Sequence, residues 1–416
     1  MLLDDIQLAV RRLSWVRTFM ATLLVVATLS VVTARCTLAL PAFARHENLK
    51  CQMCHFRLPE LLADGHAYVM RGFREKADGM TGMASAMSAH DGKAAGMESP
   101  DADAVPTLGD PLALAWQNYL TVFGHTGFDA QRNTRSRFSP GEVEAWIGGP
   151  VDEHWSALAT FVFDAEAGGV EVEQGYAHYI SSRAEKFGSA RAGKLLPFAI
   201  LLNGAGPQMP LSKPLFLESS AGARTPWAPN TPMGGLELGY VDVPHWNAYV
   251  GVGTPILDTG ADAHTDLYGS AELELNSQGN SVGVFDYHGQ IPATSSSEMV
   301  RYERTAFFAN LYRPSLKGVV GVLMGRDRVE GEPTTKSTGA FVLGEFLLSN
   351  RVAAYGRYDQ LRREQVVGDD QVTDGPTLGL SYWAQTQVRL TFEARFLKDT
   401  GSDRDRSASA ELMWVF

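Results

Sequence analysis

Apolar and polar residues alternate along most of this chain, from about Leu112 to Phe416. The clearest stretch is 388–396, where polar residues separate the apolar ones at every second position: Val388, Leu390, Phe392, Ala394 and Phe396. Segments 155–163, 170–179 and 271–275 behave similarly. Because side chains of a β-strand point alternately to its two faces, this period of two predicts strands with one apolar and one polar face.

The connections between these strands alternate in length. Tight turns are expected at 149–153, 243–245, 313–315, 349–350 and 385–387. An opening strand near 111–123 is followed by the first of the long loops, at 124–134, 204–234, 290–299, 327–337, 361–375 and 398–406. Short turns at one end and long loops at the other are typical of outer-membrane barrels. We therefore predict a mainly β chain whose residues 111–416 form a porin-like barrel of about sixteen antiparallel strands.

The last strand supports a membrane barrel. Its apolar face consists of Ala410, Leu412, Trp414 and the final residue, Phe416. A strand that ends on an aromatic residue is the usual signal for insertion into the outer membrane. A soluble β-sandwich is the alternative, but its loops would be shorter and more even in length. In a barrel, the apolar face contacts outer-membrane lipid and the Arg- and Glu-rich face lines the lumen.

Residues 1–40 resemble a secretory signal peptide. Arg11, Arg12 and Arg17 precede an apolar run over 19–34, and small residues then offer cleavage sites as far as Ala44. An N-terminal membrane anchor is the alternative, although a run of this length is short for a helix that spans a bilayer. We expect export, with the mature protein in the cell outer membrane.

Residues Cys51-Gln52-Met53-Cys54-His55 carry the clearest chemistry of the chain. The pattern C-x-x-C-H attaches c-type haem, with two thiols bonded to the porphyrin and the His as an axial iron ligand. Zinc binding and thiol redox chemistry are alternatives for a C-x-x-C pair. Cys36 is the only other cysteine, so neither a four-cysteine zinc site nor a disulfide framework is available. We therefore expect one haem c, bound through Cys51, Cys54 and His55.

The composition limits the classes of partner that the protein can bind. The formal net charge of −11 argues against nucleic acid, which requires basic surfaces. Residues 41–75 form the predicted monohaem cytochrome c segment, expected as a small helical unit that plugs the barrel. Residues 76–110 are rich in Met, Ala and Gly and are predicted to be a linker. Met80, Met83 and Met87 would suit copper, although incidental methionines in a linker are the simpler interpretation.

The chain resembles the fused monohaem cytochrome–porins of the outer membrane, best known from iron-oxidising bacteria. The resemblance covers 41–73: Pro41-Ala42-Phe43-Ala44-Arg45, the C-x-x-C-H motif, and then Pro59, Leu61, Gly65, Tyr68, Gly72 and Phe73. It implies electron transfer from extracellular Fe(II) through one haem to a periplasmic cytochrome c. The protein would be an iron-oxidising cytochrome without a catalytic triad, tuning the haem iron by its axial ligand, burial and nearby charge.

The sixth haem ligand is open in the sequence. Met70 lies fifteen positions after His55 and is the first candidate, because a methionine ligand raises the haem potential. His66 is the second candidate. The further candidates are Met80, Met83, Met87, His46 and His90. A methionine such as Met70 would also suit simple packing against a porphyrin.

Two other functions remain open. One is a diffusion porin whose haem segment is a structural or sensory plug, and the other is electron transfer with another metal, such as copper. Acidic residues of the expected loops could gather Fe(II) near the mouth, or could be ordinary solvated carboxylates. These residues are Asp258, Asp262, Asp327, Glu330, Glu332, Asp369, Asp370, Asp374, Asp399, Asp403 and Asp405.

Overall fold

The computed structural model describes residues 55–57, 60–61, 63–74, 120–131, 137–139, 141–164, 168–206, 208–257, 264–276, 278–292, 299–401 and 405–415. Cys51, Cys54, the signal segment 1–40 and the predicted linker 76–110 lie outside these residues. No helix in the described part of the chain is long and apolar enough to cross a membrane.

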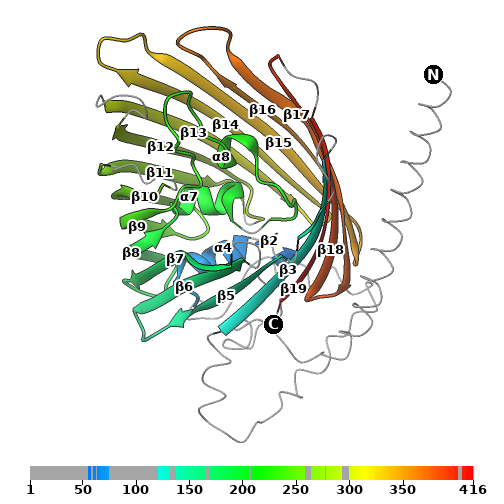
Figure 1. Ribbon diagram of the computed structural model, residues 1–416. Helices are drawn as coiled ribbons and strands as arrows, with labels where there is room; N and C mark the ends of the chain where they lie inside the picture. The colour runs from blue at the N-terminus through cyan, green and yellow to red at the C-terminus, as the bar shows by residue number, and fades with distance from the viewer. Residues whose placement is uncertain are drawn as a thin grey trace, which may run out of the picture.

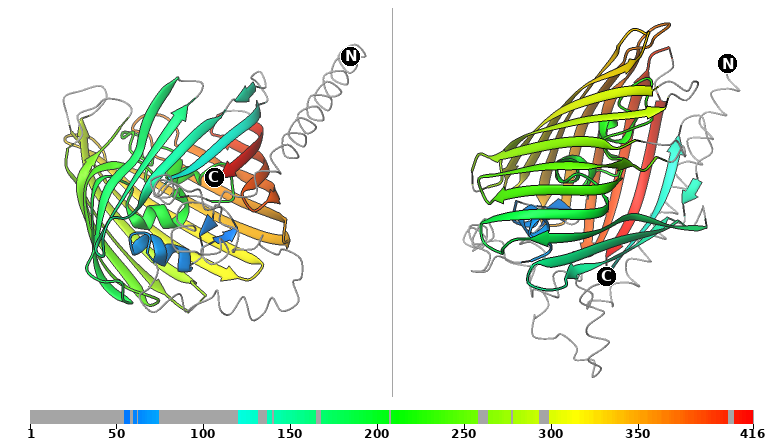
Figure 2. Two further views of the ribbon diagram at one scale, coloured as in Figure 1. Left: turned by 90° about the horizontal axis from the view of Figure 1, so that it is seen from below. Right: turned by 90° about the vertical axis from the view of Figure 1, so that its left-hand side faces the viewer.

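Sixteen long antiparallel strands close into a barrel, as Figures 1 and 2 show, in agreement with the predicted strand number. A short strand, β4, pairs with β3 over 127–129, beyond the stretch 120–124 of β3 that pairs with β5. The strands are β3 (Leu120–Gln131), β4 (Arg137–Ser139), β5 (Glu142–Pro150), β6 (Trp155–Asp164), β7 (Gly169–Ile180), β8 (Lys186–Leu195), β9 (Met233–Asp242), β10 (Trp246–Pro255), β11 (Asp266–Glu274), β12 (Ser281–Pro292), β13 (Met299–Arg313), β14 (Leu316–Val329), β15 (Thr335–Ser349), β16 (Val352–Arg363), β17 (Gln371–Gln385), β18 (Val388–Asp399) and β19 (Asp405–Val415).

Each strand pairs with its neighbour in sequence, and β19 pairs with β3 to close the barrel, from Ser407↔Gln131 to Val415↔Phe123. The connections behave as predicted at the expected tight turns: only two residues separate β13 from β14, and two separate β17 from β18. We call the end with the tight turns the turn end and the opposite end the loop end. In outer-membrane barrels these are the periplasmic and extracellular ends.

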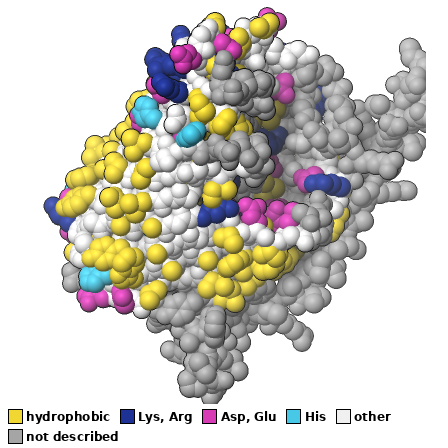
Figure 3. All heavy atoms as spheres, turned by 60° about the vertical axis from the view of Figure 1, so that its left-hand side comes forward, with side chains coloured by type: hydrophobic (Ala, Val, Ile, Leu, Met, Phe, Trp, Pro, Cys, Tyr) yellow, Lys and Arg dark blue, Asp and Glu magenta, His cyan; other side chains and the backbone are white. Residues whose placement is uncertain are grey.

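The outer face of the wall is apolar. Along β14, Val320, Val322 and Met324 are 40–50% exposed, whereas Val319 and Leu323, at alternate positions, point inward and are buried. Figure 3 shows hydrophobic side chains spread over this outer surface. Near the turn end, Trp155 packs on Tyr179 and Trp246 on Tyr240, with ring centroids 5.2 and 5.3 Å apart. Aromatic pairs at this level match the interfacial girdle of a transmembrane barrel.

The prediction for the first strand was wrong in part. A loop was expected at 124–134, but β3 continues to Gln131 and pairs with β19 along this stretch. Two glycines, Gly124 and Gly127, weaken the strand pattern in the sequence. The fold explains Gly124: a Cβ atom there would lie 2.1 Å from the Trp414 ring, so only glycine allows the two strands to approach.

Two of the described parts of the chain lie in the lumen. The first is the connection between β8 and β9, which carries α7 (Phe198–Ile200), η1 (Leu201–Ala205) and α8 (Leu215–Glu218). We call residues 196–232 the lumen loop. The second is the N-terminal segment, with the hairpin β1 (His55–Arg57) and β2 (Glu60–Leu61) followed by α4 (Ala63–Met70). Figures 1 and 2 show both parts inside the ring of strands.

Candidate functional site

Helix α4 ends in a tight reversal of the chain. The N–H groups of Arg71, Gly72 and Phe73 donate to carbonyls of the last helical turn, at Ala67, Val69 and Tyr68, each over 3.0 Å. Gly72 and Phe73 have positive φ angles of 65° and 61°. Left-handed residues of this kind satisfy the last carbonyls of a helix and stop it. The reversal directs Phe73 back onto Tyr68, with the ring centroids 6.3 Å apart.

Met70 is held in an apolar cluster. It is 2% exposed and packs with residues from the barrel wall and the lumen loop: Ile180, Phe187, Phe198, Leu202, Val241 and Tyr249. Ala67 of the same helix also belongs to this cluster. Tyr68 and Phe73 belong to the larger neighbouring cluster, which includes Leu158 and Tyr176 of the wall. Helix α4 and the reversal after it therefore contribute to both hydrophobic clusters inside the barrel.

His66 lies one helical turn before Met70, and both side chains line the same small pocket. The opposite wall of the pocket is polar and comes from strands β10 to β13, where Asn247, Glu272, Ser281 and Asn310 face it. The Ser281 hydroxyl donates to Glu272 over 2.5 Å, and the Asn310 amide donates to Ser281 over 3.1 Å. This pocket combines the two sixth-ligand candidates with hydrogen-bonding groups near the turn end.

Arg74 fastens the segment to the barrel wall. Its guanidinium donates to the carbonyl of Asp152 over 2.5 Å and also to the carbonyl of Trp155. Asp152 lies in the turn between β5 and β6, and Trp155 is the first residue of β6. The Asp152 carboxylate accepts the N–H groups of Trp155 and His154, each over 2.8 Å, and these bonds hold the pKa of Asp152 below its usual range. The arginine is 3% exposed, so the contact is a buried clamp.

Buried ion pairs anchor the lumen loop at its start and middle. Arg191 and Glu237 pair at 2.5 Å, and Glu237 also accepts the N–H of Phe198 over 3.2 Å. Farther along, Arg357 pairs with Asp359 at 2.7 Å and donates to the carbonyl of Ser212. Both pairs are fully buried, and their further hydrogen bonds to the backbone offset part of the cost of removing the charges from water, although Nη1 of Arg191 has no partner among the described residues.

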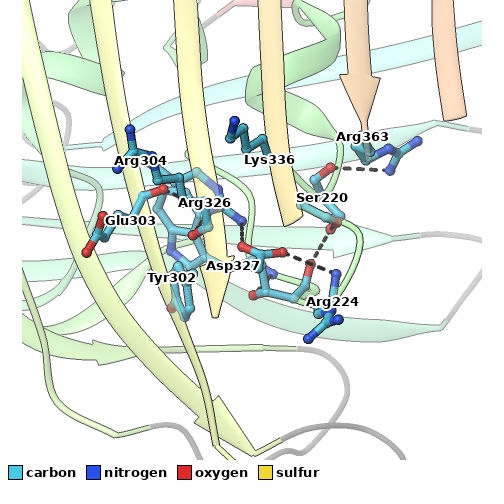
Figure 4. Close-up of polar contacts among 12 residues, drawn as sticks. Ser220, Arg224, Tyr302, Glu303, Arg304, Arg326, Asp327, Lys336 and Arg363 are labelled. Atoms are coloured by element: carbon cyan, nitrogen blue, oxygen red, sulfur yellow. Dashed lines mark hydrogen bonds and ion pairs between the residues drawn. The ribbon is translucent and has the colours of Figure 1, made fainter. Parts of the chain in front are cut away.

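A third anchor lies toward the loop end and is drawn in Figure 4. Arg304 of β13 pairs with Asp327 of β14 at 2.5 Å, and Asp327 accepts the backbone N–H of Arg224 in the lumen loop. Nearby, the Trp227 ring lies 4.2 Å from that of Tyr287. The loop is therefore fixed along its length by contacts with residues far away in the sequence.

The residues predicted to bind haem are only partly described. Cys51 and Cys54 lie outside the described residues, while His55 belongs to β1 and pairs through its backbone with Leu61. This hairpin immediately precedes α4. The structure thus brings the chain of His55 next to the start of the helix that carries His66 and Met70. Met80, Met83, Met87, His46 and His90 are outside the described residues.

The described acidic residues that were expected in loops do not gather into one site, and Asp258, Asp262 and Asp403 lie outside the described residues. Asp327 was placed in a loop, but it lies in β14, is 2% exposed and pairs with Arg304. Asp374 lies in β17 and accepts the Tyr358 hydroxyl over 2.7 Å. Asp370 pairs with Arg362 at 2.5 Å. Among the described residues there is no group of three or more His, Cys, Asp or Glu side chains able to hold a metal ion.

The lumen loop and its anchors were missed by the sequence reasoning. Residues 204–234 were expected as a long loop, and the Arg- and Glu-rich strand face was predicted only to line the lumen, with no partner for Arg191 or Arg357. The signal available was the high content of apolar residues, such as Leu215, Phe216 and Leu217, in a segment with the length of a surface loop. All three are buried in the structure.

No protein-family model and no curated protein matches the chain. Solved structures do. A loop-deletion mutant of OmpT, an outer membrane protein of Vibrio cholerae, matches with a TM-score of 0.56 at 12% identity over 71% of this chain and 98% of that one. The anion-selective porin from Comamonas acidovorans gives 0.56 at 11% identity over 71% and 99%. The outer membrane channel DcaP of Acinetobacter baumannii gives 0.52 at 10% identity over 72% and 96%.

These likenesses concern the fold. A closed barrel of sixteen antiparallel strands, an apolar outer face and the three matching structures agree on one architecture. The chain forms a porin-like β-barrel of the outer membrane.

Proposed function

We propose that this porin-like barrel is an electron-transfer protein that oxidises extracellular Fe(II). One haem c, attached through Cys51 and Cys54, would be held by the N-terminal segment at the turn end of the barrel, which is the periplasmic end. Electrons would pass on to a periplasmic cytochrome c. This proposal combines the C-x-x-C-H motif with a barrel whose lumen holds helix α4, which follows the motif in the sequence.

The docking of α4 inside the barrel is the observation that carries this proposal. The helix follows the motif within ten residues and buries Met70 between the wall and the lumen loop. Arg74 then clamps the segment to the turn between β5 and β6. A diffusion pore needs a continuous path for water, and these contacts fill part of that path. A lumen helix that closely follows a predicted haem-attachment motif fits electron transfer better.

The residues present fit a c-type haem. Two thiols with a two-residue gap, followed directly by an imidazole, are the donor set that this cofactor requires. His55 would bind the haem iron, and Met70, or His66 as second candidate, would supply the further ligand. When bound, the haem supplies one-electron redox chemistry, with a potential set by the axial ligands and burial.

The overall reaction needs little from the side chains. Fe(II) outside the cell loses one electron to become Fe(III), and the periplasmic cytochrome c gains that electron. No bond to carbon or oxygen forms or breaks, so no general base or nucleophile is required. The chain's own residues have structural tasks: α4 and Arg74 fix the position of the segment, and the apolar cluster around Met70 excludes water from it.

Proteoliposomes test this proposal. Purified haem-loaded protein is inserted with cytochrome c enclosed, and Fe(II) is added outside while visible spectra follow both haem proteins. We expect reduction of the enclosed cytochrome c, and none with the double variant Cys51→Ser/Cys54→Ser, which lacks the attachment thiols. Protein that purifies without covalent haem, or haem that Fe(II) leaves oxidised, would contradict the proposal.

A diffusion porin with a structural or sensory haem plug is the second candidate. Two of the matching structures are described as an anion-selective porin and an outer membrane channel, which favours transport. Liposome swelling in small sugars and amino acids separates the two functions. Rapid swelling together with no electron transfer would support the porin.

Electron transfer with copper is a further alternative, based on the methionine-rich stretch. Binding of Cu(I) that disappears when Met80, Met83 and Met87 are changed to Ala would favour it.

A further inference from the structure

Four basic side chains gather on the outer surface of the barrel at the loop end. Arg301 of β13, Arg326 and Arg328 of β14 and Lys336 of β15 all belong to the outward, exposed positions of their strands. We call these four residues the outer basic patch. On β14, the outward positions are Val320, Val322 and Met324, and the next two outward positions toward the loop end are Arg326 and Arg328.

Like charges face each other directly across the strands of this patch. Arg301 is the register partner of Arg328, and Arg326 is the register partner of Lys336. Side chains directly opposite each other lie about 5 Å apart at their Cβ atoms, and like charges at such positions destabilise a sheet. Because two such pairs lie side by side, we expect a bound anion to offset the repulsion between the facing positive charges.

Two carboxylates, Glu303 and Glu364, border the four basic side chains, and Glu303 is the register partner of Arg326. Glu303 pairs with Arg328 at 3.1 Å, and both side chains are partly exposed. Glu364 accepts the backbone N–H of Lys336, not its ammonium group. Within the described residues, the side-chain nitrogens of Arg301, Arg326 and Lys336 have no hydrogen bond or ion pair, and in Figure 4 the Lys336 side chain stands apart from the dashed contacts.

The position of the patch, at the border of the lipid-facing surface, indicates which class of anion it would bind. It borders the apolar outer surface, and Figure 3 shows Lys and Arg side chains at the upper margin of the hydrophobic area. A soluble ligand would be expected in the lumen or on a loop, whereas these side chains point toward lipid. Arg and Lys bind phosphate strongly, Arg often with two parallel hydrogen bonds, and basic clusters at membrane interfaces bind lipid head groups.

We propose that the outer basic patch binds the phosphate groups of the phosphorylated glycolipid in the outer leaflet of the outer membrane. One phosphate would lie between Arg326 and Lys336, and a second between Arg301 and Arg328. The acyl chains of the same lipid would cover the apolar positions of β14 below the patch. This site is independent of the lumen and of the proposed electron transfer.

Titration with lipid A tests the site. The full-length protein in detergent is titrated with bisphosphorylated lipid A, and bound lipid is counted by native mass spectrometry. We expect the double variant Arg326→Ala/Lys336→Ala to weaken binding by about tenfold or more, because two charge-assisted contacts are lost. Lipid A from which the phosphates have been removed should bind the unchanged protein as weakly as the phosphorylated form binds the variant.

A matched control uses Arg362→Ala. Arg362 lies on β16, faces outward near the same end and is already paired with Asp370 at 2.5 Å, so lipid binding should stay within about twofold of the unchanged protein. A heat-dependent shift in gel mobility confirms that each variant forms the barrel. Equal binding by the double variant, equal binding of dephosphorylated lipid, or displacement by millimolar inorganic phosphate would each overturn the proposal.

Discussion

Arg191 and Glu237 form an ion pair that is closed off from solvent inside the barrel, with Nη2 2.5 Å from Oε1 and side chains 0% and 1% exposed. The Tyr268 hydroxyl and the Phe198 N–H both donate to the second carboxylate oxygen. The Phe198 ring covers the guanidinium, with its centroid 3.5 Å from the Arg191 Cζ atom. Since Phe198 also contacts the cluster around Met70, this pair connects the wall, the lumen loop and α4.

Breaking this pair should loosen the lumen loop. In Glu237→Gln, a buried arginine loses its counter-charge, and the expected loss of stability is about 3–5 kcal/mol. Limited proteolysis should then cut within 196–232, and urea should unfold the barrel at a lower concentration. Glu303→Gln is the control, because its pair with Arg328 is partly exposed and contributes at most about 1 kcal/mol. Equal protease resistance in both variants would disprove the anchoring role.

Gly72→Ala should release the N-terminal helix. The residue has φ of +65°, and a Cβ atom would lie 2.4 Å from the Ser156 hydroxyl oxygen. Strain at the positive φ angle costs about 1 kcal/mol, and the clash with the wall adds to it. We expect faster liposome swelling in small solutes, because the released helix opens part of the lumen.

Gly168→Ala is a close control for this experiment. Its φ of +64° gives the same backbone strain, but nothing lies within 4 Å of the added Cβ atom. Swelling should therefore match that of the unchanged protein. If Gly72→Ala frees the helix, as judged by protease cleavage near Arg74, and the swelling rate stays the same, α4 does not obstruct the lumen.

Met70→Leu distinguishes a ligand from a packing residue. Leucine has nearly the same volume, so the apolar cluster should lose less than about 1.5 kcal/mol, whereas Met70→Ala should lose about 2–5 kcal/mol. In the haem-loaded protein, we expect Met70→Leu to remove the visible band of methionine-ligated ferric haem and to lower the potential. His66→Asn should leave both unchanged. The reverse result would assign the sixth position to His66.

Acid should weaken the turn that receives Arg74. The pKa of Asp152 is lowered below the ordinary value of 3.8 by N–H donation from Trp155 and His154. A carboxyl whose pKa is depressed by folding stabilises the folded state above its unfolded-state pKa and loses this contribution as the pH falls through the folded-state value. Hydrogen exchange of the Trp155 amide should accelerate in that acidic range. In Asp152→Asn the acceleration should disappear. Exchange with the same pH profile in both proteins would show that Asp152 does not cause the acid sensitivity.

Some features of this protein follow from the local sequence pattern, and others depend on long-range packing. The period of two over 388–396 is set by the geometry of one strand, so the sequence alone predicted β18, its apolar outer face and, with the connector lengths, a sixteen-strand barrel in the outer membrane. The same reasoning produced the haem hypothesis at Cys51, Cys54 and His55, because that motif is a contiguous chemical pattern.

Only the tertiary structure decided what fills the barrel. The Leu211 N–H donates to Glu393, 182 residues away. Asp327, which was expected in a loop, lies in β14 and pairs with Arg304. Lumen contacts of this kind depend on which strands close the ring, and a lumen-facing polar position looks the same in the sequence whether it meets water, a folded loop or α4. The interior of the barrel was therefore hidden from local periodicity, while its lipid-facing surface was not.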